Sequence, residues 1–134
     1  MLKDRNRILI LVPGQNARGG ITTYYKSVSP VFTLPIDYLE RGARNWPVKN
    51  NFFKELIRIF RDFYKYVRLI RTGKYSLVQT NTSFSSLAVI RDGIYLVLAR
   101  FYKLKTIVFF HGWDDRFAAK VYKDYFRIFK NVFF

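Results

Sequence analysis

The sequence predicts an α/β fold, a Rossmann-like open parallel sheet with helices on both faces, forming a single domain over residues 1–134. Short continuous apolar runs, typical of strands buried on both faces, alternate with longer segments whose apolar residues recur at helical spacing. This alternation predicts βαβ crossovers, which make successive strands parallel. Half of the 134 residues are apolar, which is enough for a sizeable core.

The first half of the chain contains two predicted strands and two predicted helices. Pro35 should place the second strand near an edge of the sheet. Asn51 is the expected N-cap of a strongly amphipathic second helix, and Gly73 closes that helix. In chain order we expect a strand over 8–12, a loop over 14–20, a helix over 21–29, a strand over 31–39, a loop over 40–50 and a helix over 51–72.

The second half continues the alternation and ends on an apolar tetrapeptide. We expect a strand over 76–80, a polar turn over 81–83, a helix over 85–102, a strand over 106–110, a helix over 117–130 and the opening of a fifth strand over 131–134. A buried strand that stops after four residues would be unusual. The 134 residues are therefore expected to be a fragment or one half of a larger assembly.

The composition combines strong positive charge with many aromatic residues. There are 24 Lys and Arg against 9 Asp and Glu, giving a net charge of +15, alongside 14 Phe, 10 Tyr and 2 Trp. The aromatic content excludes a disordered basic tail. The charge attracts phosphate in nucleic acids, anionic lipids or nucleotide-linked substrates. Without cysteine there is no disulfide, thiol nucleophile or thiolate metal site, and one histidine supplies too few ligands for a metal.

No segment is predicted to cross a membrane. The best candidate, residues 87–101, is interrupted by Arg91, Asp92 and Arg100, whereas a span needs about 20 nearly uncharged residues. We interpret Arg91 and Asp92 as an internal ion pair or polar stripe. The N-terminal apolar run is too short for a signal peptide, so a cytoplasmic location is expected.

The helix over 51–72 carries its basic residues on one face. They recur at intervals of three or four residues and so form one stripe. The stripe consists of Lys54, Arg58, Arg61, Lys65, Arg68 and Arg71.

Three loops are expected at the carboxyl edge of the sheet, where open α/β folds bind ligands. The first contains Gly14 and Gly19 at phosphate-loop spacing, but Gly20-Ile21 replaces the Lys-Ser/Thr of a Walker A motif. Gly19 and Gly20 would still let a ligand approach the backbone beside a helix N-terminus. The alternative is a plain flexible turn.

The other two loops hold polar side chains. His111, the only histidine, follows a buried strand and could bind a substrate hydroxyl or transfer a proton, with Asp114 and Asp115 close in sequence. A purely structural histidine is the alternative. Asn81, Thr82 and Ser83 form either a simple turn and helix cap or a set of substrate contacts.

Four stretches in this order resemble the N-terminal, acceptor-side domain of a family-4 retaining glycosyltransferase of the GT-B fold. They are residues 7–13 with Gly19-Gly20-Ile21, residues 75–82, residues 86–92 and residues 106–114. The resemblance implies that Gly19 and Gly20 lie against the phosphate and sugar of a nucleotide-sugar donor. It implies that His111 contacts the donor sugar, in a catalytic role, and that Asn81, Thr82, Ser83 and Asp114 are cleft or acceptor candidates.

The resemblance also implies partners. The nucleotide-sugar is a co-substrate, and neither a tightly bound cofactor nor a metal is required. Most of the donor site belongs in that family to a C-terminal domain, which these 134 residues lack, so we do not expect the chain alone to catalyse transfer. Bacterial members often act on lipid-phosphate-linked or glycan acceptors at the cytoplasmic membrane face, which would make the basic stripe a membrane-facing surface.

Because the core should need the apolar face of the helix over 51–72, we expect this membrane contact to be electrostatic, with little burial in lipid. The stripe could instead be a solvated face that maintains solubility. Two alternative functions stay open: a basic nucleic-acid-binding module, and a non-catalytic membrane-recruiting subunit of a two-chain transferase.

Overall fold

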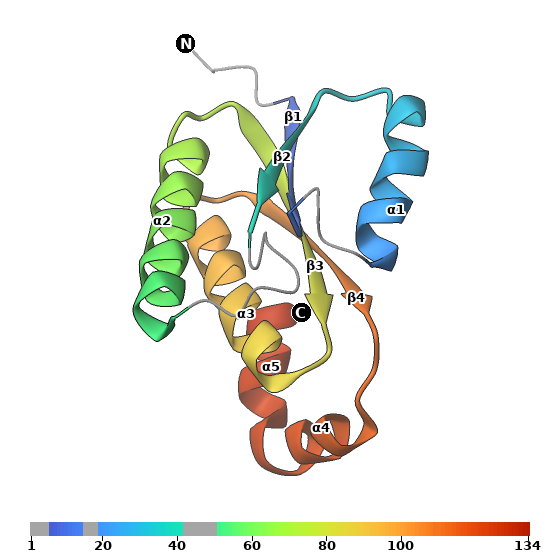
Figure 1. The fold of residues 1–134 in the computed structure, drawn as a ribbon, viewed down its shortest axis with the longest axis vertical. Coiled ribbons are helices and arrows are strands. Elements are labelled where there is room, and N and C mark those ends of the chain that lie inside the picture. The colour runs from blue at the N-terminus through green and yellow to red at the C-terminus, as the bar shows by residue number, and fades with distance from the viewer. Residues whose placement is uncertain (1–5, 15–18, 42–50) are drawn as a thin grey trace.

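A computed structural model describes residues 6–14, 19–41 and 51–134 of the chain. Within these ranges four parallel strands form one sheet in the order β2-β1-β3-β4, which confirms the predicted α/β fold (Figure 1). The strands are β1 (Arg7–Val12), β2 (Ile36–Glu40), β3 (Tyr75–Ser83) and β4 (Lys105–His111). The helices are α1 (Gly20–Val28), α2 (Phe52–Ile70), α3 (Ser86–Phe101), α4 (Asp115–Lys120) and α5 (Phe126–Phe133). The predicted loops over 14–20 and 40–50 lie partly outside the described residues.

Helices cover both faces of the sheet (Figure 1). On one face, Leu9, Leu11 and Val78 pack against α2 and α3. On the other face, Ile10 and Val12 pack against Tyr25 of α1. This division follows from the alternation of side chains along each strand, which sends successive residues to opposite faces.

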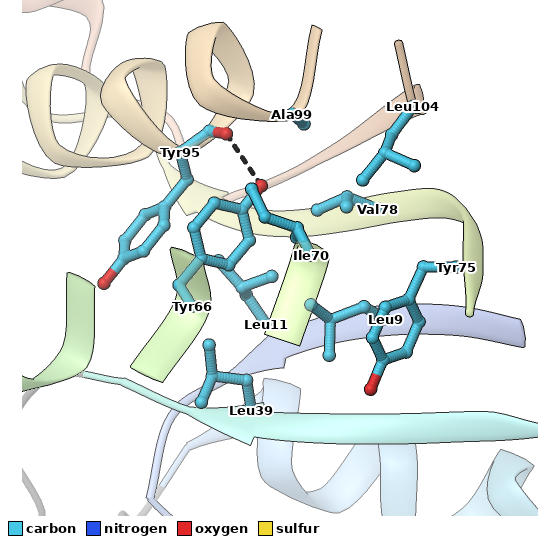
Figure 2. Close-up of a cluster of buried hydrophobic side chains, with 10 residues drawn as sticks. All are labelled: Leu9, Leu11, Leu39, Tyr66, Ile70, Tyr75, Val78, Tyr95, Ala99 and Leu104. Carbon is cyan, nitrogen blue, oxygen red and sulfur yellow. Dashed lines mark hydrogen bonds between the residues drawn. The ribbon is translucent and has the colours of Figure 1, made fainter. Parts of the chain in front are cut away.

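Tyrosines form much of the layer between the sheet and helices α2 and α3 (Figure 2). The Tyr66 hydroxyl donates a hydrogen bond of 2.8 Å to the backbone carbonyl of Tyr95. The ring of Phe63 stacks on that of Tyr95 with centroids 4.3 Å apart. Because buried hydroxyls need a partner, this bond lets a large polar ring occupy the core and also ties α2 to α3.

The C-terminal segment is helical, so the expected fifth strand over 131–134 is wrong. The predicted helix over 117–130 is instead α4, a π-helical turn over Val121–Tyr125, and α5, which continues to Phe133. Phe129 and Phe133 pack with Phe84, Val89 and Leu96 in a second apolar cluster. The apolar residues at the end of the chain thus continue a helical face.

Strand β3 extends three residues beyond its predicted end. Asn81, Thr82 and Ser83 pair with Phe109, Phe110 and His111 of β4, so they belong to the sheet and not to a turn. The ladder hydrogen bonds hold these polar residues in fixed alternation, with consequences for the site described next.

Candidate functional site

Asn81 lies at the centre of a hydrogen-bond network at the carboxyl edge of the sheet. Its amide nitrogen donates to the Leu11 carbonyl at 2.8 Å. Its side-chain oxygen accepts from the Tyr25 hydroxyl at 3.0 Å and lies 3.0 Å from Nε2 of His111. Gln79 in turn donates to the Tyr25 hydroxyl. The side chain of Asn81 therefore links β1, β3, β4 and helix α1.

This network determines the protonation pattern of the His111 ring. Because the Asn81 amide group donates to Leu11, its oxygen must face His111, and the contact requires a proton on Nε2. Burial lowers the pKa of His111 below its ordinary value of 6.5. Near neutral pH the ring is therefore uncharged, with Nδ1 available to accept a hydrogen bond. No described residue bonds to Nδ1.

Helix α1 places its N-terminus on the same face of the sheet as His111. Gly19 is its N-cap and Gly20 its first residue. A methyl group added at either glycine would meet no atom of the described residues within 4 Å, so these residues leave the space above both glycines open. The first turn contains no acidic side chain, which leaves the positive end of the helix dipole uncompensated.

Aromatic rings connect α1 to His111. Tyr24 stacks on Phe109 with ring centroids 5.9 Å apart, and Phe109 lies 4.5 Å from the His111 ring. Tyr24 and Phe109 are both partly exposed. They form an apolar floor of the kind on which a sugar or a base can stack, because ring faces provide large, rigid contact areas.

The remaining candidate residues divide between different environments. Ser83 is exposed opposite His111 and shares its face of the sheet. Thr82 points to the other face, is fully buried and donates to the Thr80 hydroxyl at 3.3 Å, so it is not placed to contact a ligand. Asp114 caps α4 by accepting from the Phe117 amide at 3.0 Å. The structure therefore groups Asn81 and Ser83 with His111.

Beneath this edge, Asp92 forms a buried ion pair with Arg41, a partner that the sequence did not predict. Arg41, only 4% exposed, reaches past the end of β1 and donates to Asp92 at 2.8 Å and to the Asn81 backbone carbonyl at 2.6 Å. Asp92 also accepts from Arg91, which confirms the local pair predicted between these neighbours. Burial lowers the pKa of Arg41 to about 10 although Asp92 opposes this.

Arg41 and Tyr25 are the residues that the sequence analysis missed. Arg41 directly follows the second strand, and a lone basic residue at that point is the available signal. Tyr25 lies one helical turn after Ile21, on the inward side of α1. Their partners lie 51 and 56 residues away, respectively, and no local pattern identifies them.

Helix α2 is less buried than the sequence predicts. Five of the six stripe residues are exposed, whereas Arg58 is half-buried and pairs with Glu55. The apolar face is also largely uncovered, since Phe53 is 75% and Phe60 is 68% exposed. Its buried residues lie in the second part of the helix, from Asp62 onward. The expectation that the core uses this whole face is wrong.

Neither a metal centre nor a membrane span is found in the described ranges. Across residues 6–14, 19–41 and 51–134, no three His, Cys, Asp or Glu side chains gather in a way that could hold a metal ion. None of the helices in these ranges is long and apolar enough to cross a bilayer. Comparison with protein-family models, curated proteins and solved structures finds no match to this chain.

Proposed function

We propose that the chain is the acceptor-side domain of a glycosyltransferase that moves a sugar from a nucleotide-sugar donor at a membrane surface. The observation that carries the proposal is the His111–Asn81 pair at the carboxyl edge of a Rossmann-like sheet, on the face that also carries the N-terminus of α1. Ligands of open α/β sheets bind at this edge.

Each part of the site matches one part of such a donor. The N-terminus of α1 favours a diphosphate, because unpaired amides and the helix dipole both attract anions. Open space above Gly19 and Gly20 allows the phosphate to approach the backbone. Nδ1 of His111 accepts a hydrogen bond from a sugar hydroxyl while Asn81 fixes the ring.

Two variants, Gly20→Ala and His111→Ala, test the donor site. Amide spectra of the chain are followed by NMR during titration with uridine and guanosine diphosphate sugars. We expect shifts centred on Gly20 and His111. Gly20→Ala should fold normally because a methyl group there meets no atom of the described part of the chain, yet it should bind the diphosphate more weakly. His111→Ala should weaken binding of the nucleotide sugar but leave binding of the free nucleoside diphosphate unchanged. Equal affinities for parent and variants would refute the assignment.

The surface of α2 supports the membrane part of the proposal. Exposed aromatic and aliphatic side chains lie beside exposed basic residues on this helix, and this combination is typical of helices that lie in a lipid headgroup region. The exposed apolar residues of α2 favour insertion over purely electrostatic contact. They are Phe52, Phe53, Leu56, Ile57, Ile59, Phe60 and Tyr64.

Vesicle sedimentation separates the two contributions. Phe53→Ser with Phe60→Ser should remove binding to anionic vesicles that persists at high salt, since burying one Phe contributes about 1.5–3 kcal/mol. Lys54→Glu with Arg61→Glu should instead remove the salt-sensitive part. Salt-steep binding to duplex or single-stranded nucleic acid, without vesicle binding, would overturn the proposal in favour of a nucleic-acid-binding module.

A further inference from the structure

A groove of about 670 Å³ runs between α3 and the segment formed by α4, the π-helical turn and α5. Its volume lies within the usual range of small-molecule sites. Ile90, Ile94 and Val97 of α3 line one wall, and Val121, Tyr125 and Ile128 line the other. Nothing in the site at the sheet edge uses this groove.

The π-helical turn gives the groove its concave shape. Val121–Tyr125 joins α4 to α5, and the chain changes direction between these two helices (Figure 1). Gly93 allows α5 to pack closely on α3, because a methyl group at this position would lie 3.1 Å from Val132 Cγ1. The groove is therefore closed along its base by helix packing and open along its rim.

One end of the groove is polar. Its polar residues at that end are Ser86, the first residue of α3, and Lys120, the last residue of α4. They belong to the same end because Phe84, just before α3, contacts Phe117 of α4 with ring centroids 5.3 Å apart. Of the described residues that line the groove, none carries a carboxylate.

We propose that this groove binds the hydrocarbon chain of a lipid phosphate, with Lys120 beside the phosphate. The apolar walls match a hydrocarbon chain, and the single cation of the lining matches an anionic headgroup. Residues 116–130 add to this complementarity with five basic residues against one acid. The inference deepens the proposed function, on which it rests for the role of the lipid phosphate as sugar acceptor.

Dodecyl phosphate, used as a dissolved monomer, tests the groove without vesicles or donor. Calorimetry should show saturable binding to the chain, no binding of inorganic phosphate, and binding of dodecyltrimethylammonium that is weaker by about tenfold or more. Ile94→Trp fills the groove, and Ile90→Glu places a negative charge on its exposed rim. Each should weaken dodecyl phosphate binding by about tenfold or more. Lys120→Glu should do the same, whereas Lys103→Glu, an equal charge change outside the groove, should leave it unchanged.

Several outcomes would overturn the inference. One is the absence of dodecyl phosphate binding by the parent chain, and another is equal binding by the parent and by folded Ile90→Glu or Ile94→Trp. Sedimentation that shows a dimer of the parent and a monomer of Ile94→Trp would assign the groove to contact between copies. Because these measurements use neither nucleotide sugar nor membrane, they succeed or fail independently of the donor-site and vesicle tests.

Discussion

Replacing Asp92 by Asn should destabilise the fold strongly. Asp92 is fully buried and accepts hydrogen bonds from Arg41 at 2.8 Å and from Arg91 at 2.9 Å. The amide keeps the shape of the carboxylate but leaves the Arg41 charge in the interior without this counter-ion. Removing one partner of a buried pair costs about 3–5 kcal/mol. Domains of this size unfold at about 5–15 kcal/mol, so the loss would be a large share of the total.

Urea unfolding followed by circular dichroism measures this loss. Arg7→Met is a suitable control, because it breaks the Arg7–Asp37 pair, whose side chains are about one-third exposed, and should cost much less than Asp92→Asn. The double variant Arg41→Met with Asp92→Leu removes both buried charges and should be more stable than Asp92→Asn. A cost below about 1 kcal/mol for Asp92→Asn, or a double variant of lower stability, would refute this reasoning.

Three further outcomes are expected from urea unfolding. Burial raises the pKa of Tyr95 to about 12 from 10.0. As the pH rises, Tyr95 therefore loses its hydroxyl proton in the unfolded state before it does so in the folded state. This contribution to the free energy of unfolding should be constant below pH 10 and should decrease towards pH 12. The decrease should be less steep in Tyr95→Phe. Gly112→Ala should cost about 1–2 kcal/mol, because φ is +73° there and the surrounding space is open. Gly20→Ala, also in open space but within α1, should gain about 0.5–1 kcal/mol; a loss would contradict the helical role of this position.

The order of strands and helices was predictable because the relevant signals are local. Continuous apolar runs such as residues 8–12 exclude a helix with one solvent-exposed face. The segments between these runs have clear helical periodicity. The end of the chain was less clear. A run of four residues, 131–134, fits either a strand or the last turn of a helix, and only its packing against α3 decides between them.

Burial on α2 was unpredictable for a different reason. Periodicity reveals that Phe53 and Phe60 lie on an apolar side of a helix, with Tyr66 on a different side, but it does not reveal which side of the helix its neighbours cover. The neighbours cover Tyr66 and leave Phe53 and Phe60 exposed. For the candidate site, Asn81 and His111 could be selected because each comes directly after a predicted strand, whereas Arg41 depends on contacts across the fold.

The bonds of Asn81 also bear on how the sheet finds its correct alignment. A parallel strand that slips by one residue sends every side chain to the opposite face. Asn81 contacts Leu11 on one neighbouring strand and His111 on the other, while Arg41 holds its backbone carbonyl. A shifted β3 would bring Thr80 or Thr82 to this position. Threonine has one short hydroxyl group in place of the separate donor nitrogen and acceptor oxygen of Asn81, so it would not reach partners on both neighbouring strands. The residue that orients the histidine thus also selects the native pairing of three strands against their misaligned alternatives.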